Sequence, residues 1–145
     1  MDKILDIKDR GTVVMRKFIL AVLAVFVAWS ILDFIIHGVL LQPTYQATAQ
    51  LWRPVAQMKM GLMYFVTFIG AATFAGLYAV LVSPKSPASG LKYGFLFGIA
   101  TGFPMGFGTY SFMPVPLTLA LTWFMGSLLE AIAGGLIVGA IIRPH

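Results

Sequence analysis

Residues 18–41 read FILAVLAVFVAWSILDFIIHGVLL, a nearly unbroken apolar run. A helix needs about 20 such residues to cross the hydrocarbon core of a bilayer. Three later stretches, 61–82, 93–112 and 117–141, have the same length and character. The sequence therefore predicts an all-α membrane protein, a four-transmembrane-helix bundle in which residues 1–145 form a single integral membrane domain.

The overall composition excludes several classes of protein. Hydrophobic residues make up 59% of the 145-residue chain and charged residues only 10%, whereas a soluble domain carries about 25% charged residues. The net charge of +5 would suit nucleic acid, but no polar domain presents a basic face, so we expect a lipid bilayer and no nucleic acid as partner. The absence of cysteine excludes disulfides, thiolate metal ligands and cysteine nucleophiles.

Basic residues predict the direction of the spans. Arg53 and Lys59 fall on one side of the bilayer, and the other side collects the larger group: Lys3, Lys8, Arg10, Arg16, Lys17, Lys85, Lys92 and Arg143. Since cytoplasmic loops carry the excess of Lys and Arg, both termini are expected in the cytoplasm of a multi-pass protein of a cell membrane, such as the bacterial inner membrane. The first apolar run is too long for a signal peptide, so we expect it to be retained.

The connection at 43–60 is predicted to be an outer interfacial segment. Thr44 is suited to cap a short helix that runs to about Leu51, and Pro54 suits the first position of the second long helix. The segment either caps the hairpin or serves as a lid that carries Arg53 towards a cavity.

The third span contains a glycine stripe. Gly94, Gly98, Gly102 and Gly106 recur every four residues, so they lie close to one face of a helix. Glycine lets a second helix approach closely in lipid, either within the chain or between copies in a homo-oligomer. Pro104 interrupts the stripe and is expected to kink the helix.

Three polar residues share one face of the first span. Ser30, Asp33 and His37 follow one another at intervals of three and four residues. Glu130 of the fourth span is the only other acid within the apolar runs. At a rise of 1.5 Å per residue, His37, Asp33 and Glu130 lie roughly 6, 12 and 20 Å below the outer surface. They form a descending series if the first and fourth spans are neighbours.

Three functional hypotheses remain open for this polar set. It lines a path for protons, cations or small solutes, in a transporter or an accessory subunit of a larger membrane complex. Alternatively, the residues only clasp helices in a structural or assembly protein. The third hypothesis, a membrane-embedded enzyme or metal site, is the weakest, because no HxxxH or ExxH pair occurs and His145 is the only other histidine. We expect no catalytic residues, no metal and no cofactor.

Overall fold

The structure is a computed structural model that describes residues 2–143, with side chains from residue 11 onward. This part of the chain is all-helical, with no strand. Three of its helices are long and apolar enough to cross a membrane: Gly11–Leu40, Met60–Leu81 and Leu117–Ile141. The prediction of an all-α protein with helices that could span a membrane is thus confirmed for these three helices. The side chains of Lys3, Lys8 and Arg10, and all of His145, lie outside the described residues.

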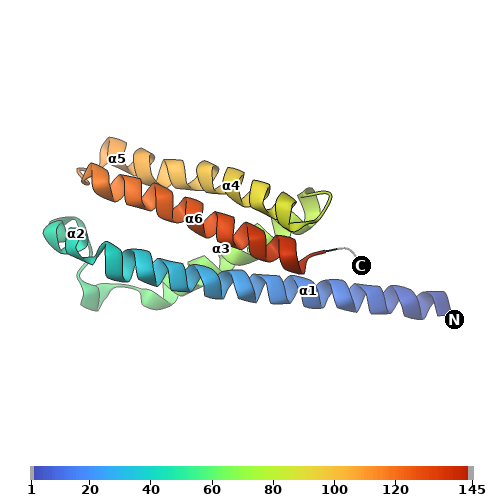
Figure 1. Cartoon of the computed structure of the whole chain (residues 1–145). Coiled ribbons are helices and arrows are strands. Elements are labelled where there is room, and N and C mark those ends of the chain that lie inside the picture. Colours follow the sequence, from blue (N-terminus) through green and yellow to red (C-terminus); the bar gives the residue numbers. More distant parts are fainter. Residues whose placement is uncertain (1, 144–145) are drawn as a thin grey trace.

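The first helix is longer than its apolar run. Helix α1 runs over Asp2–Asp33 and continues as a wider π-helical segment, η1, over Phe34–Leu40. It packs along α3, Met60–Leu81, and α6, Leu117–Ile141 (Figure 1). Lys17 donates a hydrogen bond to the carbonyl oxygen of Arg143 at 3.0 Å, so the beginning of the α1 span and the end of α6 lie at the same end of the molecule.

The predicted third span lies within a divided helical run. Helix α4, Pro87–Phe103, is followed by the π-helical η4, Pro104–Gly108, and by α5, Thr109–Phe112. The run begins at Pro87 rather than at residue 93, because the Ser86 side chain accepts a hydrogen bond from the Ser89 N–H and caps it. Pro104 lacks an N–H, and the helix widens there instead of ending. Helix α4 alone has 17 residues.

The outer connection differs from the prediction in two respects. Thr44 lies inside α2, Gln42–Ala47, and Leu41 is the N-terminal cap, because Pro43 already occupies one of the first two helical positions. Pro54 does not open the second long helix. It has an extended backbone and lies between two short 3-10 helices, η2 over Ala49–Leu51 and η3 over Val55–Gln57.

The glycine stripe of α4 lies against α6. A methyl group added to Gly94 would collide with the carbonyl oxygen of Ala131, and one added to Gly98 would stand 2.9 Å from Leu128 Cα. The whole stripe is buried in this way, from Gly90 opposite Gly135 through Gly102 to Gly106 opposite Ala120. The glycine stripe is therefore covered by α6 of the same chain.

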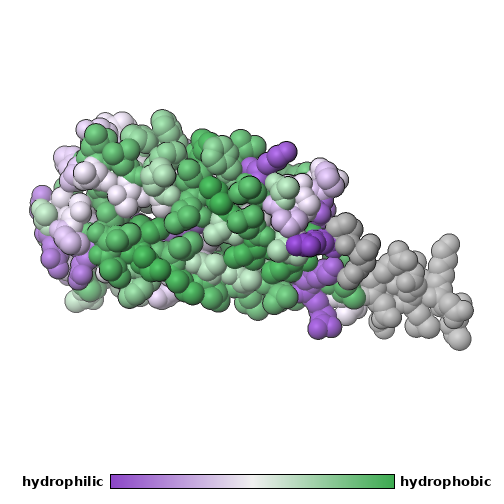
Figure 2. All heavy atoms as spheres, in the orientation of Figure 1, coloured by the Kyte–Doolittle hydropathy of each residue, from purple (hydrophilic) through white to green (hydrophobic). Residues whose placement is uncertain are grey.

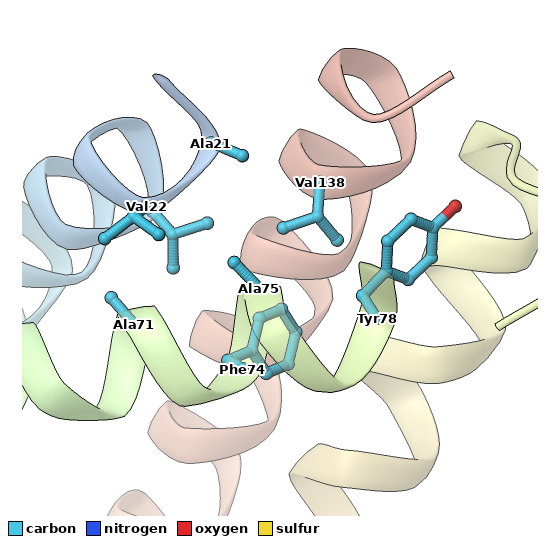
Figure 3. Close-up of a cluster of buried hydrophobic side chains, with 8 residues drawn as sticks. Ala21, Val22, Ala71, Phe74, Ala75, Tyr78 and Val138 are labelled. Carbon is cyan, nitrogen blue, oxygen red and sulfur yellow. The ribbon is translucent and has the colours of Figure 1, made fainter. Parts of the chain in front are cut away.

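Two apolar clusters fill the interior. The inner one, shown in Figure 3, joins α1, α3 and α6 and consists of Ala21, Val22, Val25, Ala71, Phe74, Ala75, Tyr78 and Val138. The outer one consists of Ile36, Leu41, Val115, Leu119 and Trp123. The surface between the two ends is itself apolar, with hydrophilic residues gathered at the ends (Figure 2). Such a surface suits lipid as its surroundings.

Candidate functional site

The interface between α1 and α6 brings the predicted polar residues together. The Trp29 indole N–H donates to the backbone carbonyl oxygen of Glu130 at 2.6 Å. Further out, the Ile36 side chain fills the space over Gly126, 3.1 Å from where a Cβ would stand. The two helices therefore run antiparallel at this interface, and Asp33 is level with Glu130.

The carboxyl groups of Asp33 and Glu130 lie close enough to influence each other electrostatically. Two carboxyl groups can share a hydrogen bond only when one of them carries a proton. In addition, the Oε1 atom of Glu130 is buried and has no hydrogen-bond partner among the described residues. The pair thus has the composition that sharing a proton between two acids requires.

The approach of these two carboxyl groups reduces the difference in depth between Asp33 and Glu130 that the sequence predicts. The estimate of roughly 12 and 20 Å for the depths of Asp33 and Glu130 used only the helix rise. However, side chains lean towards the N-terminus of their own helix. In the antiparallel pair, Asp33 leans towards the inner end and Glu130 towards the outer end, so their carboxyl groups approach each other.

His37 connects this pair to the outer segment. Its Nε2 atom lies 3.8 Å from Oδ1 of Asp33, and its Nδ1 atom lies 2.6 Å from the Tyr45 hydroxyl. That hydroxyl also accepts a hydrogen bond from the Trp123 indole N–H at 2.8 Å. An indole can only donate, so the hydroxyl keeps its own proton to donate to Nδ1 when that nitrogen is unprotonated. In that tautomer the His37 proton lies on Nε2, facing Asp33.

Aromatic rings from α2 and the following turn cover the outer side of His37. The Tyr45 ring stacks on the His37 ring at a centroid distance of 6.1 Å and an angle of 13°. Trp52 meets Tyr45 edge-on at 5.4 Å and Trp123 at 6.0 Å. Burial raises the pKa of the Tyr45 hydroxyl above its ordinary value of 10.0, and the charge of Asp33 adds to this while the Trp123 hydrogen bond opposes it. The hydroxyl therefore keeps its proton at neutral pH.

Ser30 lies at the edge of the site. Its Oγ atom is buried without a hydrogen-bond partner in the described part of the chain. The residue also lines an open groove of about 520 Å³ between α1 and α3, whose other walls are Phe26, Val27, Ile31, Phe34 and Tyr64. The polar face of α1 therefore borders an opening at the surface of the molecule.

Arg53 does not reach the polar set. It is exposed in the irregular segment before η3, and no hydrogen bond or ion pair between it and Asp33, His37 or Glu130 occurs in residues 11–143. The residue that covers His37 is Tyr45, which Trp52 contacts in turn.

Sequence reasoning missed the roles of Tyr45 and Trp123. One signal was available for Tyr45, since it follows His37 closely, across the turn at Pro43. Trp123 lies two helical turns before Glu130, and nothing in the sequence pairs it with Tyr45. Within the described residues, no three His, Cys, Asp or Glu side chains form a group that would hold a metal ion.

The sequence matches no family model, no curated protein and no solved structure. Function is therefore argued from the geometry of the site.

Proposed function

We propose that this protein binds and releases protons or small cations at Asp33 and Glu130 as part of transport across a cell membrane, alone or as a subunit of a larger membrane complex. The observation that carries the proposal is the meeting of these two acids at the α1–α6 interface, with the Glu130 Oε1 atom left without a partner. His37 is the only basic side chain in contact with either acid among the described residues.

The presence of two acids at this depth requires an energetic explanation. An ionised side chain inside the membrane costs several kcal/mol unless it is paired, and such residues commonly mark ion or proton pathways. A purely structural pair would be satisfied best by a basic partner or by further hydrogen bonds. Two acids with a free oxygen instead have the composition of a site that a proton or cation occupies and leaves.

The Tyr45–His37 hydrogen bond and the 3.8 Å approach of His37 Nε2 to Asp33 supply a route from the outer side. His37 accepts a proton on Nδ1 from the Tyr45 hydroxyl, which takes up a replacement from the outer solution, and His37 releases the proton on Nε2 to Asp33, which shares it with Glu130. The ring then returns to its first tautomer by rotation or by the reverse transfer. Further inwards the buried cluster around Phe74, Tyr78 and Val138 closes the interior. This favours a carrier, with access from one side at a time, over an open channel.

The proposal includes four spans and cytoplasmic termini. The run from Pro87 to Phe112 is helical throughout and packs along α6, which supports its assignment as the remaining span. Lys17 and Arg143 meet at one end, and Lys92, near the beginning of α4, belongs to that same end, because Pro87 contacts Gly139. The positive-inside rule then favours a cytoplasmic location for this end.

The proposal is tested by flux measurements in proteoliposomes with an imposed pH gradient. We expect Asp33→Asn and Glu130→Gln each to abolish the proton-dependent flux of the wild type. Lys59→Gln, which replaces an exposed basic residue of the outer segment, is the control and should leave the flux intact. Equal flux in the wild type and both acid variants would overturn the proposal.

Two contacts favour a structural role for this interface. Trp29 donates a hydrogen bond to the Glu130 backbone, and Ile36 fits over Gly126. If the acids only clasp the helices, the wild type shows no flux, and both acid variants unfold at a lower temperature in detergent.

A further inference from the structure

A second groove lies at the other end of α1, away from the polar set. It has a volume of about 500 Å³, within the range of about 300–1,000 Å³ that is typical of small-molecule sites. Its walls are Val13, Arg16, Lys17, Ile19, Leu20 and Leu23. Hydrophilic side chains form a band at this end of the molecule, beside its apolar body (Figure 2).

From Arg16 onward the lining changes from charged to apolar along the helix axis. Arg16 and Lys17 lie at the end of the molecule where Lys17 meets Arg143, and Ile19, Leu20 and Leu23 follow towards the middle of the helix. From Arg16 to Leu23 the helix rises by about 10 Å. Ile19, Leu20 and Leu23 are 51%, 58% and 49% exposed, so the rest of the described chain leaves about half of each uncovered.

The two cations are placed to bind an anion. Lys17 is half-buried, and one of its N–H groups donates to the Arg143 carbonyl oxygen, which fixes its position and leaves two further donors. Arg16 is exposed beside it and presents a planar set of donors that matches a phosphate group. Cations at one end of an aliphatic groove match an anionic head attached to an apolar chain.

We infer that this groove binds one anionic phospholipid of the membrane leaflet at that end of the molecule. Its phosphate lies between Arg16 and Lys17, and one acyl chain runs over Ile19, Leu20 and Leu23. The inference does not depend on the proposed transport function, because the groove shares no residue with the polar set.

Native mass spectrometry of the whole protein in detergent tests the site, with phosphatidylglycerol and phosphatidylcholine as probes. We expect one phosphatidylglycerol to bind more tightly than phosphatidylcholine. Arg16→Gln should weaken phosphatidylglycerol binding about fivefold, as the loss of one cation near a lipid headgroup predicts, with little effect on phosphatidylcholine. Lys92→Gln, which removes a cation at the same end but outside the groove, is the matched control and should bind like the wild type.

A second variant tests the acyl chain. Leu20→Trp fills the groove without changing its charge and should weaken both lipids, whereas Leu121→Trp, on an exposed part of α6, should weaken neither. Thermal unfolding of each variant verifies that it is folded. Equal effects of Arg16→Gln and Lys92→Gln would overturn the inference in favour of general surface attraction. Glycerol phosphate that competes for the site as effectively as phosphatidylglycerol would also overturn the inference, since the apolar part of the groove would then contribute nothing to binding.

Discussion

Helix α6 packs against its two main neighbours in different ways. Towards α4 it meets a row of glycines, and backbone atoms approach so closely that Gly94 and Ala131 leave no room for a methyl group. Towards α1 its small residues are covered by larger side chains of α1: Ile36 lies over Gly126 and the indole of Trp29 contacts its backbone. At this interface the acids Asp33 and Glu130 also meet.

The comparison indicates that neither interface depends on polar groups for adhesion. In lipid, close packing of small residues supplies the attraction between helices, and the α4–α6 interface uses it fully. The α1–α6 interface also packs well where Ile36 covers Gly126. Its acids leave the Ser30 and Glu130 oxygens without partners, so they add little to adhesion. This contrast is the reason for assigning them to function.

The largest effect on stability is expected at the glycine interface. Gly94→Ala should lower the free energy of unfolding by about 1–3 kcal/mol, the usual cost of overpacking, because its methyl group meets the Ala131 carbonyl oxygen. Gly76→Ala in α3, where a Cβ meets nothing within 4 Å, is the matched control and should not destabilise. Unfolding in mixed detergent micelles measures both, and equal stability of the two variants would contradict the close contact.

A smaller effect is expected at the outer end of the polar interface. Tyr45→Phe removes the hydroxyl that links His37 and Trp123, and should cost about 0.5–1.5 kcal/mol. It should also release the His37 tautomer, which nitrogen NMR of labelled histidine observes directly. An unchanged imidazole spectrum would show that Tyr45 does not orient the ring. Trp52→Phe, which keeps an aromatic ring beside Tyr45, should leave the tautomer as it is.

The smallest effect concerns alkaline pH. The pKa of Tyr45 is raised in the folded protein, so the unfolded chain loses this proton first as the pH rises. The contribution of the Tyr45 hydroxyl to the free energy of unfolding is therefore fully present below pH 10 and is lost progressively above it. The stability difference between wild type and Tyr45→Phe should shrink between about pH 9 and pH 11. A difference that stays constant over this range would contradict the burial of the hydroxyl.

How much the sequence predicted depends on the range of the interactions involved. Residues 61–82 and 117–141 could be placed because a long apolar run reports directly on the membrane. The shared face of Ser30, Asp33 and His37 follows from helix geometry alone. The cover of Tyr45 and Trp52 could not be predicted, since it depends on how short turns fold back over the helix ends. The meeting of Asp33 with Glu130 required knowing that α1 and α6 are antiparallel neighbours.

The central claim is that Asp33 and Glu130 act as one unit that holds a proton. Infrared difference spectroscopy of the protein in membranes, recorded during a pH titration, observes the C=O stretch of a protonated carboxyl group directly. We predict one titrating band that both Asp33→Asn and Glu130→Gln shift or remove. Two bands that titrate independently, each lost in only one variant, would contradict the claim.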